Sequence, residues 1–282
     1  MSVVSTPATL KHAAGMIDDA EARRIRNDFP ILNRQVNGSP LVYLDSGATS
    51  QNPLCVLEAE QEFYEQRNAA VHRGAHSLAV SATDVFEDAR ETVAGFINAG
   101  MDELVWTSNA TEAINLVAYA FSNASAGRGG DAASRFVLGP GDELVVTEME
   151  HHANLIPWQE LAFRTGATLR YIPVDDAGAL RLDEAEQMIG PRTKVLAFTH
   201  ASNVLGTINP VAEVAEMARP SRALLLVDGA QAAPHMPVNV HALGCDFYAF
   251  SSHKMVGPTG VGVLWARPGL LEAMEPFLGG GE

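Results

Sequence analysis

Short apolar runs alternate with stretches of helical periodicity from residue 41 onward. The candidate strands are LVYLD (41–45), ELVWTS (103–108), ELVVTEM (143–149), TLRYIPV (168–174), KVLAFTH (194–200), ALLLVD (223–228), FYAFSS (247–252) and VGVLWA (261–266). Most are almost entirely apolar, which is typical of strands that helices cover on both faces of a parallel sheet. The pattern predicts an α/β fold with a mainly parallel central sheet flanked by helices.

Between these runs, apolar residues recur at helical spacing. One predicted helix follows residue 45 and presents an apolar face formed by Val85, Phe86, Ala89, Val93, Phe96 and Ile97. A second begins after Asn109 and directs Ile114, Val117 and Phe121 inward. A third follows His152 and ends before Gly166.

Two segments are predicted to lie apart from this core. Residues 1 to about 15 are expected to form a mobile arm, and DDAEARRIRNDFP (18–30) is expected to form a short helix stopped by Pro30. We therefore predict an appendage over 1–40 and one domain over 41–282. NASAGRGGDAASRF (123–136) has the Gly, Ala and Ser content of a flexible surface loop.

Composition narrows the classes of function. The 282 residues, 47% of them hydrophobic, can bury a sizeable core. The formal net charge of -15 would repel nucleic acid and anionic lipid, so neither partner is expected. The first residues lack the pattern of a secretory signal, and no apolar stretch is long enough to span a bilayer. These features and the two widely spaced cysteines, Cys55 and Cys245, favour a cytoplasmic protein without disulfides.

Lys254 is the first candidate for chemistry. It lies in Ser251-Ser252-His253-Lys254, where a buried strand ends, and ligands bind at the carboxyl ends of strands in open α/β sheets. A lysine that burial makes neutral could attack an aldehyde as a nucleophile. The alternative is a surface lysine in a turn between two strands.

A carboxylate upstream of Lys254 favours the functional interpretation of this lysine over the surface-turn alternative. Asp228 ends the run ALLLVD, and Gln231 lies one turn further on. Asp228 could cap a helix, but it could also pair with a protonated pyridine nitrogen, while the Gln231 amide reaches the ring hydroxyl.

Two further segments could complete a cofactor site. In Asn109-Ala110-Thr111 a small-residue turn opens a helix, which could be an ordinary capped helix start or a phosphate cradle. His151 and His152 follow a strand, and an imidazole can stack on a flat heteroaromatic ring. No metal site is expected, because no histidine pair stands at zincin spacing with a glutamate.

Together these segments resemble the class V, fold-type I pyridoxal-phosphate enzymes, and among them the group II cysteine desulfurases of the SufS type, which serve iron–sulfur assembly. The matching blocks are YLDSGATS, VHRGAHSLA, NATEAINLV, EMEHHANLIPWQ, FTHASNVLGTINP, VDGAQAAPHMPV, CDFYAFSSHKMVGPTGVGVL and PFLGGGE, from about Leu41 to the end. The resemblance implies that 41–282 is the large, cofactor-binding domain.

The resemblance also implies a role for each matching residue. Lys254 would be the Schiff-base lysine, His151 the ring-stacking residue, Asp228 the partner of the pyridine nitrogen and Gln231 the partner of the ring oxygen. Thr111, Ser251 and His253 would hold the phosphate with help from the Ala110 backbone. Asn203 would lie near the ring and the substrate carboxylate, and Ala48 would approach the substrate. Ser252 and Gly47 replace the glycine and alanine common in the family.

Members of that family convert L-cysteine to L-alanine and pass the sulfur on as a persulfide. They continue past GGGE into a small domain with the nucleophilic cysteine and a substrate-binding arginine, so the chain is expected to be truncated. The resemblance further implies a homodimer and a sulfur-acceptor protein. A selenocysteine lyase, another class V enzyme and a non-catalytic fragment remain open at this point.

Overall fold

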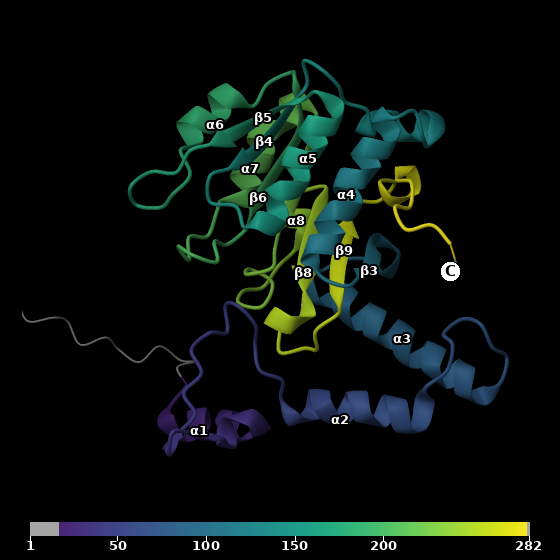
Figure 1. Cartoon of the computed structure of the whole chain (residues 1–282), viewed down its shortest axis with the longest axis vertical. Coiled ribbons are helices and arrows are strands. Elements are labelled where there is room, and N and C mark those ends of the chain that lie inside the picture. Colours follow the sequence, from purple (N-terminus) through teal and green to yellow (C-terminus); the bar gives the residue numbers. More distant parts are fainter. Residues whose placement is uncertain (1–16, 281–282) are drawn as a thin grey trace, which may run out of the picture.

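The computed structural model describes residues 17–280 and contains a seven-stranded sheet with the strand order β3-β9-β8-β7-β6-β4-β5 (Figure 1). Its strands are β3 (Leu104–Thr107), β4 (Glu143–Thr147), β5 (Thr168–Ile172), β6 (Thr193–Thr199), β7 (Leu224–Asp228), β8 (Phe247–Ser251) and β9 (Gly262–Ala266). Each of them coincides with a run predicted from the sequence.

The direction of the strands confirms a mainly parallel sheet. The pairs β4–β5, β4–β6, β6–β7 and β7–β8 are parallel. Strands β3 and β8 both pair with β9 antiparallel, so both run in the direction of the other parallel strands. Every strand of this sheet except β9 therefore ends at the same edge.

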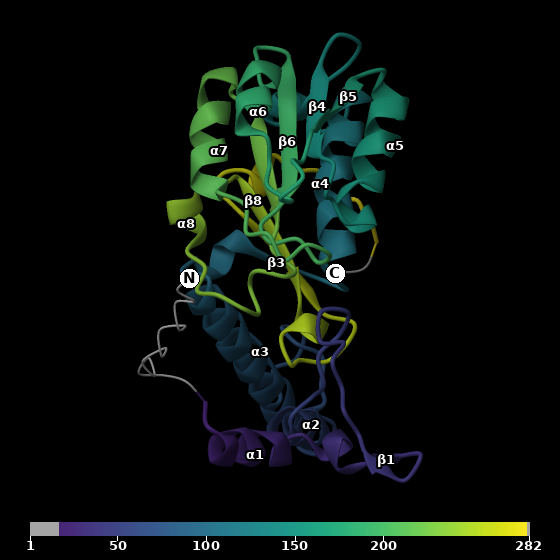
Figure 2. The ribbon, with the colours of Figure 1, turned by 90° about the vertical axis from the view of Figure 1, so that its left-hand side faces the viewer.

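Helices cover both faces of the sheet. The α-helices are α1 (Asp19–Asn27), α2 (Leu54–Glu62), α3 (Ser77–Phe96), α4 (Ala110–Ser125), α5 (Ile156–Thr165), α6 (Leu182–Met188), α7 (Val211–Ala218) and α8 (Val240–Leu243). In Figure 2, α4 and α5 lie on one side of the sheet and α6 and α7 on the other. Helices α1 and α2 lie below the sheet, and α3 rises from them toward it.

Shorter helical segments join these elements. They are the 3-10 helices η1 (Pro30–Asn33), η3 (Met101–Glu103), η4 (Gly130–Phe136), η5 (His152–Asn154), η6 (Arg219–Ser221), η7 (Ser252–Lys254) and η8 (Leu271–Ala273), and the π-helix η2 (Phe63–Arg67).

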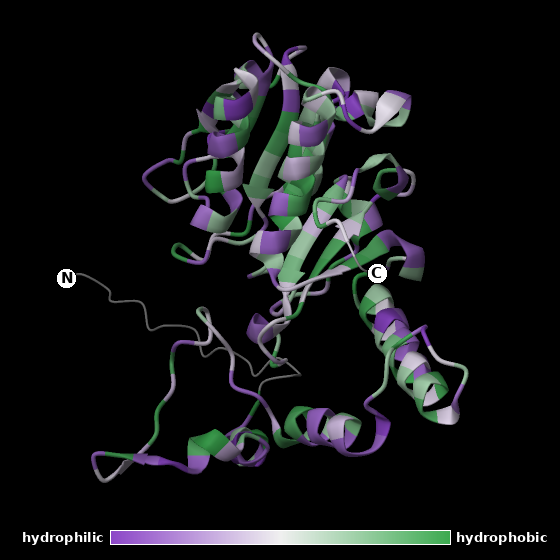
Figure 3. Ribbon diagram, turned by 45° about the vertical axis from the view of Figure 1, so that its right-hand side comes forward, coloured by the Kyte–Doolittle hydropathy of each residue, from purple (hydrophilic) through white to green (hydrophobic). Residues whose placement is uncertain are grey.

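Two apolar cores result, one on each face of the sheet. The first joins β-strand residues to α4, α5 and η4, and it contains Ile114, Val117 and Phe121 as predicted. The second joins the opposite face to α6, α7, α8 and the end of α3. Every residue of β4, β7, β8 and β9 is buried, and Figure 3 shows the strands as the hydrophobic centre of the fold.

The predicted face of α3 is only partly in the core. Ile97 is fully buried, whereas Val85, Phe86 and Val93 are half-buried and Phe96 is 50% exposed. The buried positions within α3 itself are three alanines, at 79, 82 and 94.

The N-terminal segment contains the predicted short helix. Asp18 caps α1 by accepting a hydrogen bond from the Glu21 N–H, and no side chain of α1 is buried. The predicted arm over residues 1 to about 15 lies outside the described residues. Beyond α1, Asn37 and Gly38 both have positive φ and connect the two-stranded hairpin of β1 (Gln35–Val36) and β2 (Ser39–Pro40), which the sequence interpretation missed.

Two predictions are wrong. The run LVYLD (41–45) forms no strand, because no neighbouring strand pairs with it, and Leu44 is 91% exposed. The supposed loop 123–136 instead contains the end of α4 and η4. Phe136 is buried there and packs edge-on against Phe121, which anchors the segment to the first core.

Within residues 17–280, no helix combines the length and apolar character needed to cross a bilayer.

Candidate active site

A cavity of about 610 Å³ opens where β6, β7 and β8 end and α4 begins. Every residue singled out from the sequence as a site residue lines it. They are Ala48, Ala110, Thr111, His151, Asn203, Asp228, Gln231, Ser251, His253 and Lys254. The common strand direction explains this convergence, because it brings distant chain segments to one edge of the sheet.

Lys254 lies at the end of η7, directly after β8, and is half-buried. Burial lowers its pKa from the ordinary value of 10.5, and the negative charge of Asp228 opposes that change. A lowered pKa increases the fraction of neutral amine, which is the nucleophilic form.

Asp228 is the last residue of β7 and is 5% exposed. Burial raises its pKa, while a hydrogen bond from the Ala230 N–H and the charges of Lys254 and His151 oppose the rise. Ala230 donates to Oδ1 over 2.9 Å, and among the described residues no hydrogen bond reaches Oδ2. The open oxygen suits a cationic N–H donor in the cavity.

The start of α4 forms the second wall of the cavity. Asn109 is the N-cap, and its Oδ1 accepts from the Glu112 N–H over 2.9 Å. The Ala110 N–H donates to Ser251 Oγ over 2.7 Å, so these two predicted phosphate ligands already contact each other. The Ser251 hydroxyl proton, the Thr111 hydroxyl and the helix dipole remain available to an anion.

Glycine is required where β9 passes this helix start. A Cβ built on Gly262 would overlap the Asn109 backbone, far inside normal contact. The close approach of β9 to Asn109 therefore fixes the position of the α4 N-terminus relative to the neighbouring strand β8.

The segment DSGATS folds back over the lysine loop. The His253 carbonyl accepts hydrogen bonds from the Ser50 N–H over 2.8 Å and from the Thr49 hydroxyl over 3.1 Å. Gln231 Nε2 donates to the Gly47 carbonyl over 2.6 Å, which holds Ala48 at the cavity. One proton of the Gln231 amide is thereby engaged and the second stays available.

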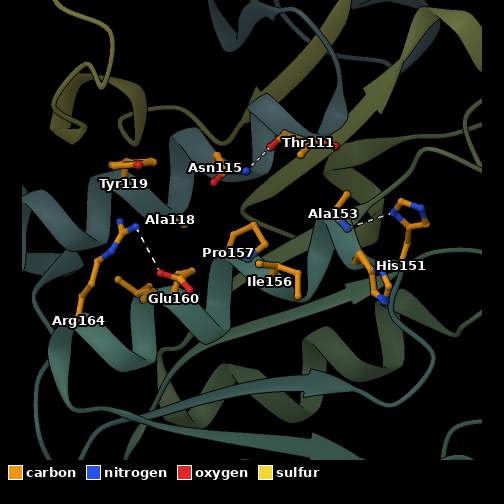
Figure 4. Close-up of a pocket in the computed structure, with 12 residues that line it drawn as sticks. Thr111, Asn115, Ala118, Tyr119, His151, Ala153, Ile156, Pro157, Glu160 and Arg164 are labelled. Atoms are coloured by element: carbon orange, nitrogen blue, oxygen red, sulfur yellow. Dashed lines mark hydrogen bonds and ion pairs between the residues drawn. The ribbon is translucent and has the colours of Figure 1, made fainter.

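His151 lies at the boundary of two hollows. Its Nδ1 accepts from the Ala153 N–H over 3.1 Å, and its side chain is exposed. Figure 4 shows this bond and the neighbouring hollow of about 390 Å³ between α4 and α5, which shares Thr111, His151 and Ala153 with the main cavity. Asn203 lies on an exposed loop and also lines the main cavity.

Comparison with known proteins agrees with this arrangement. The aminotransferase class-V family model matches residues 42–282. The chain belongs to the aminotransferase class-V family. A probable cysteine desulfurase of Halalkalibacterium halodurans is 52% identical over 93% of this chain and 62% of its own length.

Solved structures show the same relationship for this class-V chain. The apo cysteine desulfurase of Thermococcus onnurineus is 41% identical with a TM-score of 0.82, covering 92% of this chain and 60% of its own. A structure described as SspA in complex with cysteine is 26% identical with a TM-score of 0.73, covering 86% and 65%. The class-V chain thus spans roughly three fifths of the length of its first curated relatives.

Class-V aminotransferases and cysteine desulfurases use pyridoxal 5′-phosphate, and the residues present fit that group. The cavity offers an amine of lowered pKa, a buried carboxyl with one open oxygen, and hydroxyls at a helix N-terminus. These features match an aldehyde, a protonated ring nitrogen and a phosphate respectively.

The class-V site also depends on residues that sequence reasoning missed. Gly229 directly follows Asp228, and a Cβ built on it would overlap the ring of Tyr248, whose hydroxyl is 2.9 Å from His200 Nδ1. Glu150 directly precedes His151 and is bound by three donors. Nothing in the local pattern marks these residues, because their contacts are tertiary.

Proposed function

We propose that this protein is a pyridoxal-phosphate-dependent cysteine desulfurase, which converts L-cysteine to L-alanine and passes the sulfur on as a persulfide. The observation that carries the proposal is the convergence of Lys254, Asp228 and the α4 N-terminus on one cavity. The names of the relatives and the cysteine-bound structural neighbour support the substrate.

We assign the residues as follows. Lys254 holds the cofactor covalently through Nζ, and Asp228 accepts a hydrogen bond from the ring nitrogen. Gln231 donates its free amide proton to the ring oxygen, and His151 covers one face of the ring. Thr111, Ser251 and His253 bind the phosphate, and the Ala110 backbone assists by donating a hydrogen bond to Ser251 Oγ. Asn203 and Ala48 contact the substrate at the rim.

The bound cofactor supplies an electron-withdrawing ring that stabilises negative charge at the substrate Cα. Once the amino group of the substrate has displaced it from the cofactor, the freed Lys254 amine would accept the Cα proton, because its lowered pKa keeps part of the amine neutral. Asp228 retains its negative charge when the protonated ring nitrogen of the cofactor faces it. The imidazole of His151 covers the open face of the cofactor ring and shields it from water.

Sulfur transfer needs a thiolate that the described cavity does not contain. Cys245 is buried away from it, and burial raises its pKa far above the ordinary range, so it stays a thiol. Cys55 is exposed on α2 and does not line the cavity. We propose that the nucleophilic cysteine lies in a second, small domain. This domain would correspond to the part of the longer relatives that the present chain does not match.

We test the proposal by incubating the chain, and a version extended to the length of the relatives, with L-cysteine and pyridoxal phosphate. Dithiothreitol is included to reduce the enzyme persulfide to sulfide. Under these conditions the extended protein is expected to release alanine and sulfide in equal amounts, and the short chain is expected not to complete sulfur transfer. Equal turnover by both would contradict the assignment of the cysteine, and no alanine from either would contradict the function itself.

The remaining features of the proposal come from the family. We propose a homodimer, a sulfur-acceptor protein, a role in iron–sulfur cluster assembly and a cytoplasmic location. Their support is the same family relationship that suggests the substrate.

A further inference from the structure

Glu150 follows β4, next to His151, and joins three separate parts of the fold. Its Oε1 accepts hydrogen bonds from the Thr147 hydroxyl and, over 3.0 Å, from the Thr199 N–H. Its Oε2 accepts from Asn154 Nδ2 over 2.6 Å. One carboxyl therefore links the ends of β4 and β6 with the short helix η5.

The orientation of Asn154 is fixed independently. Trp158 Nε1 donates to Asn154 Oδ1 over 3.0 Å, and both side chains are fully buried. Because an indole N–H can only donate, Asn154 must turn its oxygen toward Trp158 and its amide group toward Glu150. The position at Glu150 Oε2 thus requires an acceptor.

The same network reaches the strand that ends in Asp228. Next to Thr199, which donates to Glu150, the His200 N–H donates to the Asp228 carbonyl over 2.9 Å. On the other side of Glu150, His151 stands between Glu150 and Asn154 in the chain. Through these hydrogen bonds the Glu150 carboxyl connects the loop that carries His151 to the strand end that carries Asp228.

We propose that Glu150 is a positioning residue that fixes the His151 ring relative to Asp228, and so sets the slot into which the cofactor ring fits. The inference rests on the proposed function, because it assigns His151 and Asp228 to the two contacts of that ring. Glu150 touches neither substrate nor cofactor in this role and acts through its neighbours.

The donor pattern makes glutamine an unsuitable replacement for Glu150. In one orientation the amide group of the new side chain would face Asn154 Nδ2, and in the other it would face the Thr199 N–H, so one buried donor always meets another donor. Changing Asn154 to aspartate at the same time restores the pattern. The introduced glutamine then donates to the introduced aspartate, whose second oxygen still accepts from Trp158.

The experiment compares Glu150→Gln, Asn154→Asp and the double variant with the wild-type chain. Without cofactor and at about pH 5, where most of the pH-dependent stability of Glu150 is still present, Glu150→Gln is expected to lower the melting temperature by about 3–8 °C, because one buried donor is left unpaired. The double variant is expected to recover most of this loss. This cycle requires no cofactor, so it tests the network even if the proposed function fails.

The positioning role is read from the visible circular dichroism of bound pyridoxal phosphate and from its dissociation constant. Glu150→Gln is expected to weaken binding about tenfold, equivalent to about 1.4 kcal/mol, and to reduce the dichroism per bound cofactor. The double variant is expected to restore both. Glu160→Gln, on the exposed face of α5, serves as the matched control and is expected to change neither.

Two results would overturn the inference. If the double variant melted no higher than Glu150→Gln, the donor pattern would not be what holds the network together. If Glu150→Gln melted lower but bound the cofactor with unchanged affinity and dichroism, the residue would stabilise the fold without positioning His151.

Discussion

At the scale of single residues, Glu150 combines burial with proximity to a second carboxyl. Burial raises its pKa from 4.5 to about 8, hydrogen bonds from Thr147, Asn154 and Thr199 oppose the rise, and the charge of Asp228 adds to it. The folded state therefore holds this proton more tightly than the unfolded chain does. Stability from this group is greatest below pH 4.5 and is lost as the pH rises to about 8.

This shift in pKa predicts that the difference in unfolding free energy between the wild type and Glu150→Gln depends on pH. Glutamine does not titrate, so the wild-type chain should lose on the order of 4 kcal/mol relative to the variant between pH 4.5 and pH 8. Urea unfolding of both chains at about pH 5 and about pH 8 measures the change. If the difference in unfolding free energy between wild type and Glu150→Gln were the same at both pH values, burial would not raise the pKa of the Glu150 carboxyl.

Several site residues could be found from the sequence pattern because they stand at the end of a predicted strand or the start of a predicted helix, whereas Ala48 and Asn203 were assigned only through the family resemblance. Asp228, Ser251 and Lys254 follow or end apolar runs, and the parallel sheet brings such positions to one edge. Glu150 and Tyr248 could not be found in this way. Their significance lies in contacts with residues from other elements, which no local pattern records.

At the scale of elements, the approach of β9 to the start of α4 sets the phosphate side of the cavity. A methyl group on Gly262 would displace the Asn109 backbone and with it the α4 N-terminus. We predict that Gly262→Ala destabilises the chain by about 1–3 kcal/mol, as overpacking usually does. We also expect about tenfold weaker binding of pyridoxal phosphate, equivalent to about 1.4 kcal/mol.

Chemical denaturation and a cofactor titration measure the two effects of Gly262→Ala. Gly95→Ala in α3 is the matched control, since nothing lies within 4 Å of the added Cβ and no loss of stability or affinity is expected. A Gly262→Ala chain as stable as the wild type would mean that β9 does not constrain the helix.

Element prediction succeeded where an apolar run was paired and failed where it was not. The seven strands of the main sheet lie between helices, so their composition reveals them. LVYLD has the same composition but no strand to pair with, and Tyr43 instead donates to the Thr49 carbonyl over 2.6 Å. The opposite error occurred at 123–136, where the Gly, Ala and Ser content predicted a flexible loop. Phe136 nevertheless packs in the core and holds the segment in a defined structure.

At the scale of the whole molecule, residues 17–40, the described part of the segment before residue 41, make few contacts with the rest. No side chain of α1 or η1 is buried. The described hydrogen bonds that cross the boundary include Leu54 N–H to the Asp28 carbonyl over 2.7 Å and Arg26 to the Leu41 carbonyl over 2.8 Å. We therefore propose that 1–40 is an appendage and 41–282 the cofactor-binding domain.

This division predicts that a chain beginning at residue 41 keeps its fold. Its melting temperature should fall by less than about 5 °C, because no buried apolar side chain of the described residues is removed. Pyridoxal phosphate should bind with little change in affinity. Thermal unfolding and a cofactor titration check the prediction, and an unfolded or aggregated product would place 1–40 within the cooperative unit.

The central claim is that the Lys254 amine attaches the cofactor, and one measurement tests it most directly. The cofactor-saturated protein is reduced with borohydride, digested and examined by mass spectrometry. The only other lysines are Lys11 and Lys194, and the Lys194 amine lies 3.7 Å from the Asp142 carboxylate, outside the cavity residues. We predict a pyridoxyl group on Lys254, retained in Lys194→Ala and absent in Lys254→Ala. A pyridoxyl group on another residue of the wild-type protein would contradict the account.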